Sequence, residues 1–487
     1  MSISKNRPAT FGALKAAGYT YKTIKDELRD NLVAKIKADH PVFEGIIGYE
    51  HTVIPQLKKA ILSKHNINLL GLRGQAKTRI ARLMTDLLDE FIPVVKGSTI
   101  NDDPFKPISK MARDLVAEKG DDTPIEWLGR SDRFFEKLAT PDVSVADLIG
   151  DIDPIKAANL KLSYADEEVI HYGMVPRANR CLFVINELPD LQARIQVALF
   201  SILQEGEVQI RGFKMKLPLD VAFVFTANPE DYTNRGSIVT PLKDRIGSQI
   251  LTHYPKTTAI AKEITRQEAK TVVEGLFISE AARDLIEAIA FEARTSEYVD
   301  AKSGVSARLS ISAFENAVSG AELRMIQNNE SSSALRVLDI MNIGPAITGK
   351  VELVYEGEQE GADFVAQELI KKAVLTTFEQ HFPKIEKLEK KGAPSAYDTL
   401  YTWFFENDPV ELLDDAPDEF FQSELDRIKP LDELLKAHFP DCPKSERHFY
   451  KEIILWGLVA KEKLNSSRID HKTTFNDLYN SYFSGLE

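Results

Sequence analysis

Cysteine is almost absent from this chain of 487 residues, which contains Cys181 and Cys442 and no others. Two cysteines exclude a disulfide-based scaffold and a zinc site built from cysteine ligands. Long apolar runs are also lacking, since no stretch approaches the roughly 18 residues that a membrane-spanning helix needs. The N-terminus, MSISKNRPAT, has no apolar core of the kind found in signal peptides. We therefore expect a soluble, cytoplasmic protein without a membrane span.

An excess of positive charge is lacking too. The 61 lysine and arginine residues are outnumbered by 74 aspartate and glutamate residues, so that the formal net charge is −13. The molecule as a whole would not attract the phosphate backbone of DNA or RNA over long range. A nucleic-acid partner is therefore not expected, although a local basic patch would be compatible with this composition.

A glycine-rich segment follows a short apolar run at 67–70. It reads Gly71, Leu72, Arg73, Gly74, Gln75, Ala76, Lys77 and Thr78. This order predicts a strand, a turn and a helix start, in which N–H groups of the turn bind phosphates, Lys77 reaches the outer phosphates and Thr78 ligates Mg²⁺. Ala76 departs from the pattern, which has glycine before the lysine. If the backbone there has a positive φ, alanine costs roughly 1 kcal/mol.

A second apolar run, at 181–185, ends in Asn186 and Glu187. We expect a buried strand that carries these two side chains at its tip. In nucleoside-triphosphate sites an Asp at the position of Asn186 usually orders the Mg²⁺ shell. Asn186 keeps an acceptor oxygen but loses the charge, whereas Glu187 is expected to orient the attacking water. Together with the glycine-rich turn, this strand predicts a site for ATP and Mg²⁺.

Further side chains are expected around the same site. Asn228 follows a buried strand at 221–226, and the C-terminal ends of parallel strands face the ligand crevice. Arg245 could stabilise charge on the transferred phosphoryl group from across a subunit boundary, with Arg235 as a competing candidate. Arg308, at a helix start in a second domain, could reach the phosphates when the domains close. The predicted nucleotide-contacting residues are Ile47, Gly48, Gly71, Gly74, Gln75, Ala76, Lys77, Thr78 and Arg79, with Thr78 and Asn186 as metal ligands.

The length suggests two to four domains. Strands that alternate with helices predict a parallel α/β sheet, and we expect helices at 54–63 and 191–204. A region at about 100–140, with a helical pattern at 127–138, is interpreted as an insert. The expected division is a helical N-terminal segment at 1–40, an α/β nucleotide-binding domain at 41–255, a helical lid at 256–345 and a mostly helical C-terminal region of unknown role at 346–487.

Three other segments carry recognisable patterns. Short alternating runs at 207–211 and 214–217 predict a hairpin, whose Arg211, Lys214 and Lys216 could contact a substrate segment or an acidic partner, or form a solvated polar face. Residues 351–355 could be an isolated strand. The stretch 406–426 contains nine acidic residues and no basic one, which is typical of a solvated face or loop.

In their order and spacing, these elements resemble the AAA+ ATPases of the helix-2-insert clade, and within it the magnesium chelatase motor subunit and its MoxR relatives. The resemblance covers about residues 40–330, and the stretch 145–155 resembles the one before helix 2 in the chelatase motor. It implies a P-loop NTPase fold of the α/β class: a parallel sheet core, a helical lid and an additional mostly helical C-terminal region. In the terms of that family Asn228 matches sensor 1, Arg245 the arginine finger and Arg308 sensor 2.

The same resemblance implies partners. The subunits would form a homo-oligomeric ring, expected to be a hexamer, in which Arg245 of one subunit completes the ATP site of the next. A separate partner protein would carry a von Willebrand factor A-type, metal-binding domain, and the ring would act on a client protein.

Three functions remain open at this point. The first is an ATP-hydrolysing motor that remodels or matures a partner complex or, by the same mechanism, drives insertion of magnesium into a porphyrin. The second is a scaffold that binds ATP and hydrolyses it slowly or not at all, because Ala76 and Asn186 depart from the motif. The third is a DNA-remodelling ATPase with the basic hairpin in a groove or pore, against which the negative net charge speaks.

Overall fold

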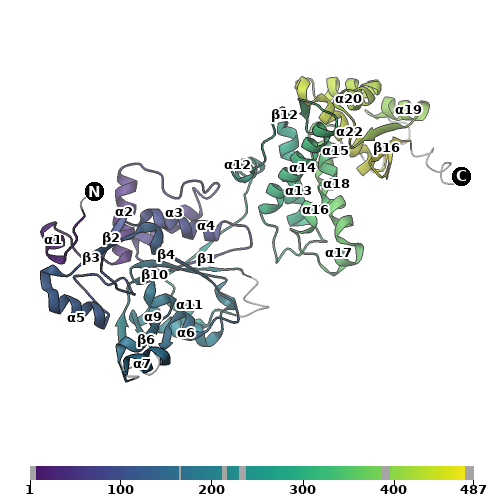
Figure 1. The fold of residues 1–487 in the computed structure, drawn as a ribbon. Helices are drawn as coiled ribbons and strands as arrows, with labels where there is room; N and C mark the ends of the chain where they lie inside the picture. The colour runs from purple at the N-terminus through teal and green to yellow at the C-terminus, as the bar shows by residue number, and fades with distance from the viewer. Residues whose placement is uncertain (1–6, 164–165, 211–215, 230–236, 386–394, 478–487) are drawn as a thin grey trace. The chain divides into compact units, whose positions relative to one another are not determined.

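The computed structural model describes the whole chain except residues 1–6, 164–165, 211–215, 230–236, 386–394 and 478–487 (Figure 1). Two compact units follow each other along the chain, Met1–His253 and Tyr254–Glu487.

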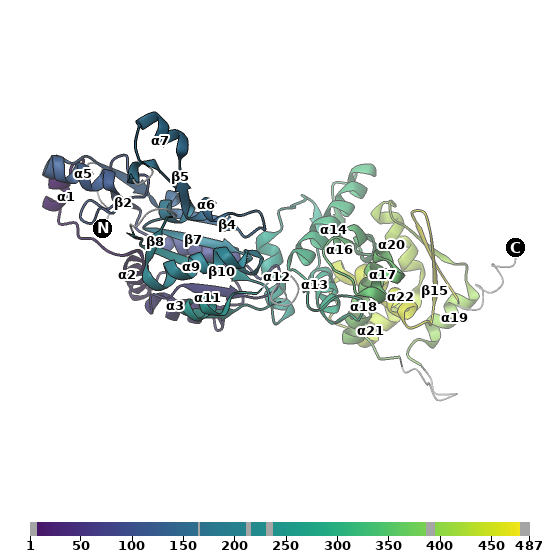
Figure 2. The ribbon, with the colours of Figure 1, turned by 90° about the horizontal axis from the view of Figure 1, so that it is seen from below.

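The first unit is built on a parallel sheet. In the part of the chain that the structure describes, this sheet has five strands in the order β11-β1-β10-β7-β4 (Figures 1 and 2). The strands are β1 (Ile67–Leu70), β4 (Phe134–Leu138), β7 (Cys181–Asn186), β10 (Val221–Ala227) and β11 (Ser248–Leu251). All neighbouring pairs are parallel, and Leu70 is level with Ala227 while Leu138 is level with Asn186. The C-terminal strand ends therefore meet at one edge, as the sequence predicts.

Helices cover both faces of this sheet because its central strands are apolar on both sides. Successive side chains of a strand point to opposite faces, so that Phe183 and Ile185 enter one buried cluster whereas Leu182 and Val184 enter another. The first cluster packs under α9 (Ala193–Glu205) and α11 (Thr240–Arg245), and the second under α2 (Ile24–Lys37), α3 (Val53–Leu62) and α4 (Lys77–Leu83). The helices expected at 54–63 and 191–204 are thus confirmed.

Smaller elements surround the sheet. An antiparallel pair, β2 (Phe91–Val95) and β3 (Ile125–Gly129), flanks α5 (Lys110–Lys119), and α1 (Phe11–Ala16) lies nearby. Between α6 (Val145–Leu148) and α8 (Met174–Arg177), the pair β5 (Gly150–Ile152) and β6 (Ile170–Tyr172) carries α7 (Pro154–Leu160), which projects from the unit in both views (Figures 1 and 2). The predicted hairpin is present as β8 (Glu207–Gln209) and β9 (Lys216–Pro218).

The helix predicted at 127–138 is wrong. Residues 125–129 and 134–138 form β3 and β4, and β4 pairs with β7 as a strand of the central sheet, so the end of the presumed insert belongs to the core. As the last strand of the sheet, β4 keeps most of its side chains half-buried. It therefore lacks the continuous apolar run that identifies the inner strands.

The second unit is mostly helical, and one cluster of buried residues extends from Ala281 to Phe475. The separate lid and C-terminal domains stay a prediction. The helices are α12 (Thr258–Glu268), α13 (Glu280–Thr295), α14 (Arg308–Gln327), α15 (Val337–Met341), α16 (Gly344–Thr348), α17 (Tyr355–Glu360), α18 (Ala362–His381), α19 (Asp398–Glu406), α20 (Asp418–Arg427), α21 (Lys429–His438) and α22 (Arg447–Ala460). The strands are β12 (Leu276–Phe277), β13 (Ser333–Ala334), β14 (Val410–Leu413), β15 (Asn465–Ile469) and β16 (Lys472–Asn476).

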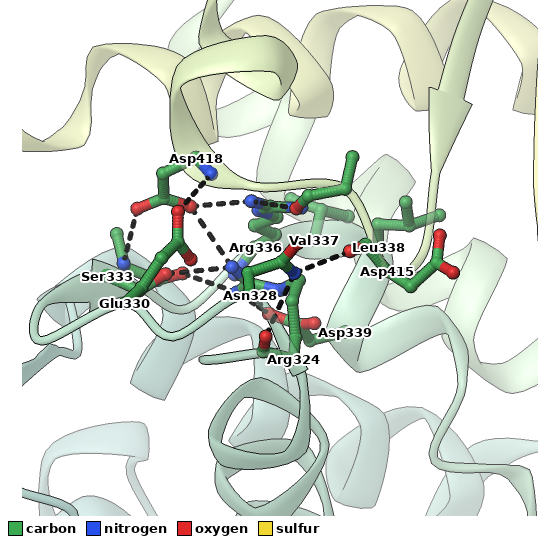
Figure 3. Close-up of polar contacts among 12 residues, drawn as sticks. Arg324, Asn328, Glu330, Ser333, Arg336, Val337, Leu338, Asp339, Asp415 and Asp418 are labelled. Carbon is green, nitrogen blue, oxygen red and sulfur yellow. Dashed lines mark hydrogen bonds and ion pairs between the residues drawn. The ribbon is translucent and has the colours of Figure 1, made fainter. Parts of the chain in front are cut away.

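The strand predicted at 351–355 is wrong, since Leu353 forms a single bridge with Val299 and α17 begins at Tyr355. The solvated acidic face predicted at 406–426 also needs correction. Asp418 pairs with Arg324 at 3.1 Å and with Arg336 at 2.6 Å, and both arginines are buried (Figure 3). Part of the acidic run therefore neutralises cations inside the unit, which local composition cannot show because the partners lie some 80 to 95 positions earlier in the chain.

Candidate functional site

The glycine-rich loop leaves the sheet at the end of β1 and enters α4 at Lys77. At Gly71 a Cβ atom would lie 1.9 Å from Thr252 Oγ1 and 2.2 Å from Gln75 Oε1, so that any other residue would have to displace these two side chains. At the helix entry, Ala76 has φ 57° and ψ 16°. The backbone of Ala76 therefore has the positive φ considered from the sequence. Alanine adopts this left-handed conformation at a cost of roughly 1 kcal/mol.

A buried hydrogen-bond network holds the loop from behind. Thr252 Oγ1 donates to Gln75 Oε1 at 2.6 Å, and Tyr49 Oη donates to the carbonyls of Gln75 (3.1 Å) and His253 (2.7 Å). Burial raises the pKa of Tyr49 to about 12, which keeps this hydroxyl a donor. Tyr49 and Thr252 were not predicted from the sequence, although an aromatic residue next to the predicted Gly48 was a usable signal. These contacts fix the loop before any ligand binds.

The structure brings together Lys77 and Asn228, two of the residues predicted to contact the phosphates. Lys77 Nζ donates to Asn228 Oδ1 at 2.8 Å, to the carbonyl of Leu72 at 2.8 Å and to that of Gly71. Asn228 directly follows β10, so these contacts place the ammonium group between the loop and the C-terminal edge of the sheet. A lysine side chain is flexible and its charge is compact. It can exchange carbonyl partners for phosphate oxygens with little rearrangement.

Thr78 and Asn186 also meet. Both Thr78 Oγ1, at 3.2 Å, and Thr226 Oγ1, at 3.1 Å, donate to Asn186 Oδ1. On its other side, Asn186 Nδ2 donates to Glu136 Oε1 at 2.7 Å. Glu136 was not predicted, because it lies on β4, the strand that was interpreted as a helix. The amide is thus fixed in one orientation by two donors and one acceptor.

Glu187 follows at the tip of β7 with φ 57° and ψ 48°, and its N–H donates to Thr226 Oγ1 at 3.2 Å. Three strands thereby contribute to one hydrogen-bond network with the loop, through Thr226 of β10, Asn186 of β7 and Glu136 of β4. Lys77, Glu187 and the amides of Asn186 and Asn228 lie at this C-terminal edge of the sheet, and such a set is suited to binding and cleaving a polyphosphate.

Most of the other predicted residues are among those that the structure describes. Arg245 ends α11, where it pairs with Asp244, donates from Nε to Gln204 Oε1 at 3.3 Å and stacks 5.2 Å from the Phe200 ring. Arg308 begins α14 in the second unit, as expected of a helix-start residue. Ile47 is half-buried, Gly48 donates its N–H to Glu50 at 2.9 Å, and Arg79 is exposed on α4. Arg211, Lys214 and Arg235 lie outside the described residues, and Lys216 begins β9.

The donor set fits Mg²⁺ held together with a nucleotide. In the described ranges no three His, Cys, Asp or Glu side chains gather as a metal cluster. Magnesium bound to a nucleotide needs little more than a hydroxyl or carboxylate, phosphate oxygens and water. Thr78 Oγ1 and Asn186 Oδ1, 3.2 Å apart, supply protein oxygens on one side of the loop.

Within the described part of the chain, no helix has the length and apolar character needed to cross a bilayer.

Comparison with known proteins agrees with this geometry. Residues 160–247, which contain Asn186, Glu187, Asn228 and Arg245, match the family model of the sigma-54 interaction domain. The chain is 25% identical over 237 residues to the magnesium-chelatase 38 kDa subunit of Cereibacter sphaeroides (47% of this chain, 63% of that protein). It is 23% identical over 229 residues to that of Rhodobacter capsulatus (46% and 59%). The chain thus spans about six-tenths of the length of these relatives.

Among solved structures, a complex between subunits BchI and BchD of magnesium chelatase contains a similar chain, with a TM-score of 0.34 and 18% identity over 65% of this chain and 98% of that one. The predicted fold class, an AAA+ P-loop NTPase with a mostly helical second part, is confirmed by the parallel sheet and the family match. The chain resembles AAA+ ATPases, including the magnesium-chelatase subunit, at low identity.

Proposed function

We propose that this protein is an AAA+ motor that binds ATP with Mg²⁺, hydrolyses it and uses the energy to remodel or mature a partner protein complex, in the manner of a MoxR-like ATPase. The observation that carries the proposal is the contact between Lys77 and Asn228 beside the Thr78–Asn186 pair. A phosphate loop, a sensor amide and a metal-side amide thereby converge at the C-terminal edge of a parallel sheet, where such folds bind nucleotides.

Each residue has a distinct role in this proposal. The N–H groups of the loop and Lys77 bind the β- and γ-phosphates, and Asn228 holds the lysine and senses the γ-phosphate. Thr78 and Asn186 orient the shell of the Mg²⁺, which when bound neutralises charge on the phosphates. Glu187 orients the attacking water and accepts its proton. Ile47, Gly48, Gly74, Gln75 and Arg79 complete the predicted nucleotide contacts.

Assembly into a ring is part of the proposal. Arg245 has a side chain that is 36% exposed at the end of α11, so that it can be reached from outside the chain. From a neighbouring subunit it would stabilise the charge of the transferred phosphoryl group, an effect of about 10³–10⁵ in rate in other NTPases. Arg308 would act as the second sensor. A hexameric ring, a partner with a von Willebrand factor A-type domain and a client protein complete the expected assembly.

Two alternatives have specific support. The left-handed Ala76 and the uncharged Asn186 favour a scaffold that binds ATP and hydrolyses it slowly. The name of the relatives, a magnesium-chelatase subunit, favours insertion of magnesium into a porphyrin together with partner subunits. These alternatives share the same nucleotide site and differ in what its occupation drives.

Phosphate release by the purified protein separates motor from scaffold. The motor predicts turnover that depends on protein concentration, because neighbouring subunits supply Arg245, and that is lost in Glu187→Gln while nucleotide binding persists. ATP binding without turnover at any protein concentration supports the scaffold, and in that case Asn186→Asp should create or raise activity. Stimulation of turnover by a porphyrin and partner subunits would identify the chelatase function.

A further inference from the structure

The amide of Asn186 stands where a carboxylate usually orders the magnesium shell, and a carboxylate lies directly behind it. Asn186 Nδ2 donates to Glu136 Oε1 at 2.7 Å, and the two residues come from neighbouring parallel strands, β7 and β4. The side chain of Glu136 is 27% exposed, so it is held at the rim of the site rather than in open solvent.

We propose that Glu136 is a positioning residue for Mg²⁺. Through Asn186 it supplies the negative charge that an aspartate at position 186 would carry, and it fixes the amide with its oxygen toward the metal side. This inference rests on the proposed nucleotide site. It gives a role in that site to Glu136, a residue that lies outside both the phosphate loop and the tip of β7.

The orientation of the amide depends on this carboxylate. An ionised carboxylate only accepts hydrogen bonds, so Asn186 must turn Nδ2 toward Glu136 and Oδ1 toward the hydroxyls of Thr78 and Thr226. Thr226 Oγ1 in turn accepts from the N–H of Glu187. Without an acceptor at position 136, the amide could rotate and present its N–H₂ group to a cation. The carboxylate of Glu136 therefore holds the Asn186 amide with its Oδ1 atom toward Thr78.

The charge of Glu136 is only partly compensated. Arg82 Nη2 lies 2.7 Å from Glu136 Oε2, but the arginine side chain is 65% exposed. Ion pairs with such exposed partners are weak and screened by solvent. The bond to Asn186 polarises the amide, because a hydrogen bond to an ionised acceptor is strong, and increases the negative charge on Oδ1. In metal sites, partners that orient a ligand in this way contribute about 10–100-fold to metal affinity.

The test measures how Mg²⁺ changes the affinity for a fluorescent ATP analogue, without reference to hydrolysis. Glu136→Gln keeps an acceptor for the Asn186 amide but removes the charge, and Glu136→Ala removes both. We expect the apparent Mg²⁺ affinity to fall about 10-fold in Glu136→Gln and further in Glu136→Ala. Affinity for the analogue in EDTA should match that of the unmodified protein in both variants, which also shows that they are folded. The control is Arg82→Ala, which removes the other partner of Glu136 and should not weaken Mg²⁺ binding.

A reciprocal exchange distinguishes charge from packing. In Glu136→Gln/Asn186→Asp the carboxylate and the amide trade places, so that the hydrogen bond and the charge are both kept. We expect this double variant to regain the Mg²⁺ affinity that Glu136→Gln loses, whereas a purely structural role for Glu136 predicts that Asn186→Asp raises Mg²⁺ affinity by the same factor in the unmodified and the Glu136→Gln backgrounds. Asn186→Asp alone places two carboxylates in contact and should gain less than the double variant.

The outcomes are separable. The role of Glu136 is overturned, while the nucleotide site stands, in either of two cases. In the first, the affinities of Glu136→Gln for Mg²⁺ and for the analogue are within about twofold of those of the unmodified protein. In the second, the double variant does not recover the Mg²⁺ affinity, or Asn186→Asp raises this affinity by the same factor in both backgrounds. If the unmodified protein binds no nucleotide with or without Mg²⁺, the proposed function is overturned, and this inference with it.

Discussion

Two clusters of charged and polar side chains, one in each unit, differ in their burial and in the partners of their cations. At the sheet edge of the first unit, Lys77 and Asn186 are half-buried, and the lysine bonds to carbonyl oxygens and an amide. In the second unit, Arg324 and Arg336 are 2% and 3% exposed and pair with Asp339 and Asp418 (Figure 3). In the first cluster the bonds of the lysine go to two carbonyl oxygens and an amide, whereas in the second cluster arginines and carboxylates face each other.

This difference separates a binding site from a structural contact. Arg324 also donates to Ser333 Oγ at 2.8 Å and to the carbonyl of Ala334 at 3.0 Å, so its guanidinium joins α14 to β13, α15 and α20. A ligand would have to break ion pairs to enter. At Lys77 it would replace hydrogen bonds to the carbonyls of Gly71 and Leu72 and to the amide of Asn228. A concentration of charge in a sequence can therefore serve a structural contact as well as a binding site, and the partners that the fold supplies distinguish the two.

The largest predicted effect breaks the buried cluster. Asp418→Ala leaves both arginines buried without one of their carboxylates and should lower the stability of the second unit by about 3–5 kcal/mol. Hydrogen exchange of peptides from α14 and α15 should accelerate, while exchange of β7 and β10 stays unchanged. The matched control is Asp415→Ala in the same acidic run. Asp415 is exposed, and only its backbone carbonyl is used, by Asn328 at 2.7 Å. Equal effects of the two substitutions would contradict the distinction.

The stabilities of the two units are expected to depend differently on pH. Glu452 is buried and accepts hydrogen bonds from the N–H groups of Val337 and Leu338. Burial raises the pKa of Glu452 from an ordinary value of 4.5 to about 8. Above pH 4.5 the unfolded chain has lost this proton while the folded chain keeps it, so stability falls as pH rises to about 8. In the first unit, burial raises the pKa of Asp220 only to about 6. Between pH 6 and 8 the second unit should therefore lose on the order of 2 kcal/mol that the first unit keeps.

Denaturation of the full chain at pH 6, 7 and 8, followed by hydrogen exchange of each unit, checks this expectation. Glu452→Gln should remove the pH dependence of the second unit over this range. An unchanged slope in that variant would assign the dependence to other groups.

The sequence predicted those parts of the site that lie in contiguous motifs. The phosphate loop, the strand tip at Asn186 and Glu187, and Asn228 follow unbroken apolar runs, which identify inner strands whatever their partners are. Glu136 could not be recognised, because β4 is a half-exposed edge strand whose pattern resembles a helix. The ion pairs of Asp418 were equally hidden, since their partners lie far away in sequence. Contacts made between distant segments need the fold.

The smallest predicted effect concerns the loop itself. Ala76→Gly should stabilise the first unit by up to about 1 kcal/mol, because glycine adopts the left-handed backbone without strain. Ala34→Gly, at an exposed position of α2, should have the opposite sign, with a loss of about 0.5–1 kcal/mol. Urea denaturation of the two variants measures both effects, and a loss of stability in Ala76→Gly would contradict the strain assigned to this position.

The central claim is that the loop around Lys77 binds a nucleoside triphosphate with Mg²⁺. Calorimetric titration with a non-hydrolysable ATP analogue and Mg²⁺ tests it directly, with Lys77→Ala compared with Lys59→Ala, an exposed lysine on α3. The account predicts saturable binding that Lys77→Ala weakens by about 100-fold or more, equivalent to at least about 2.7 kcal/mol, and that Lys59→Ala leaves intact. Absence of binding by the unmodified protein, or equal affinities in the two variants, would contradict it.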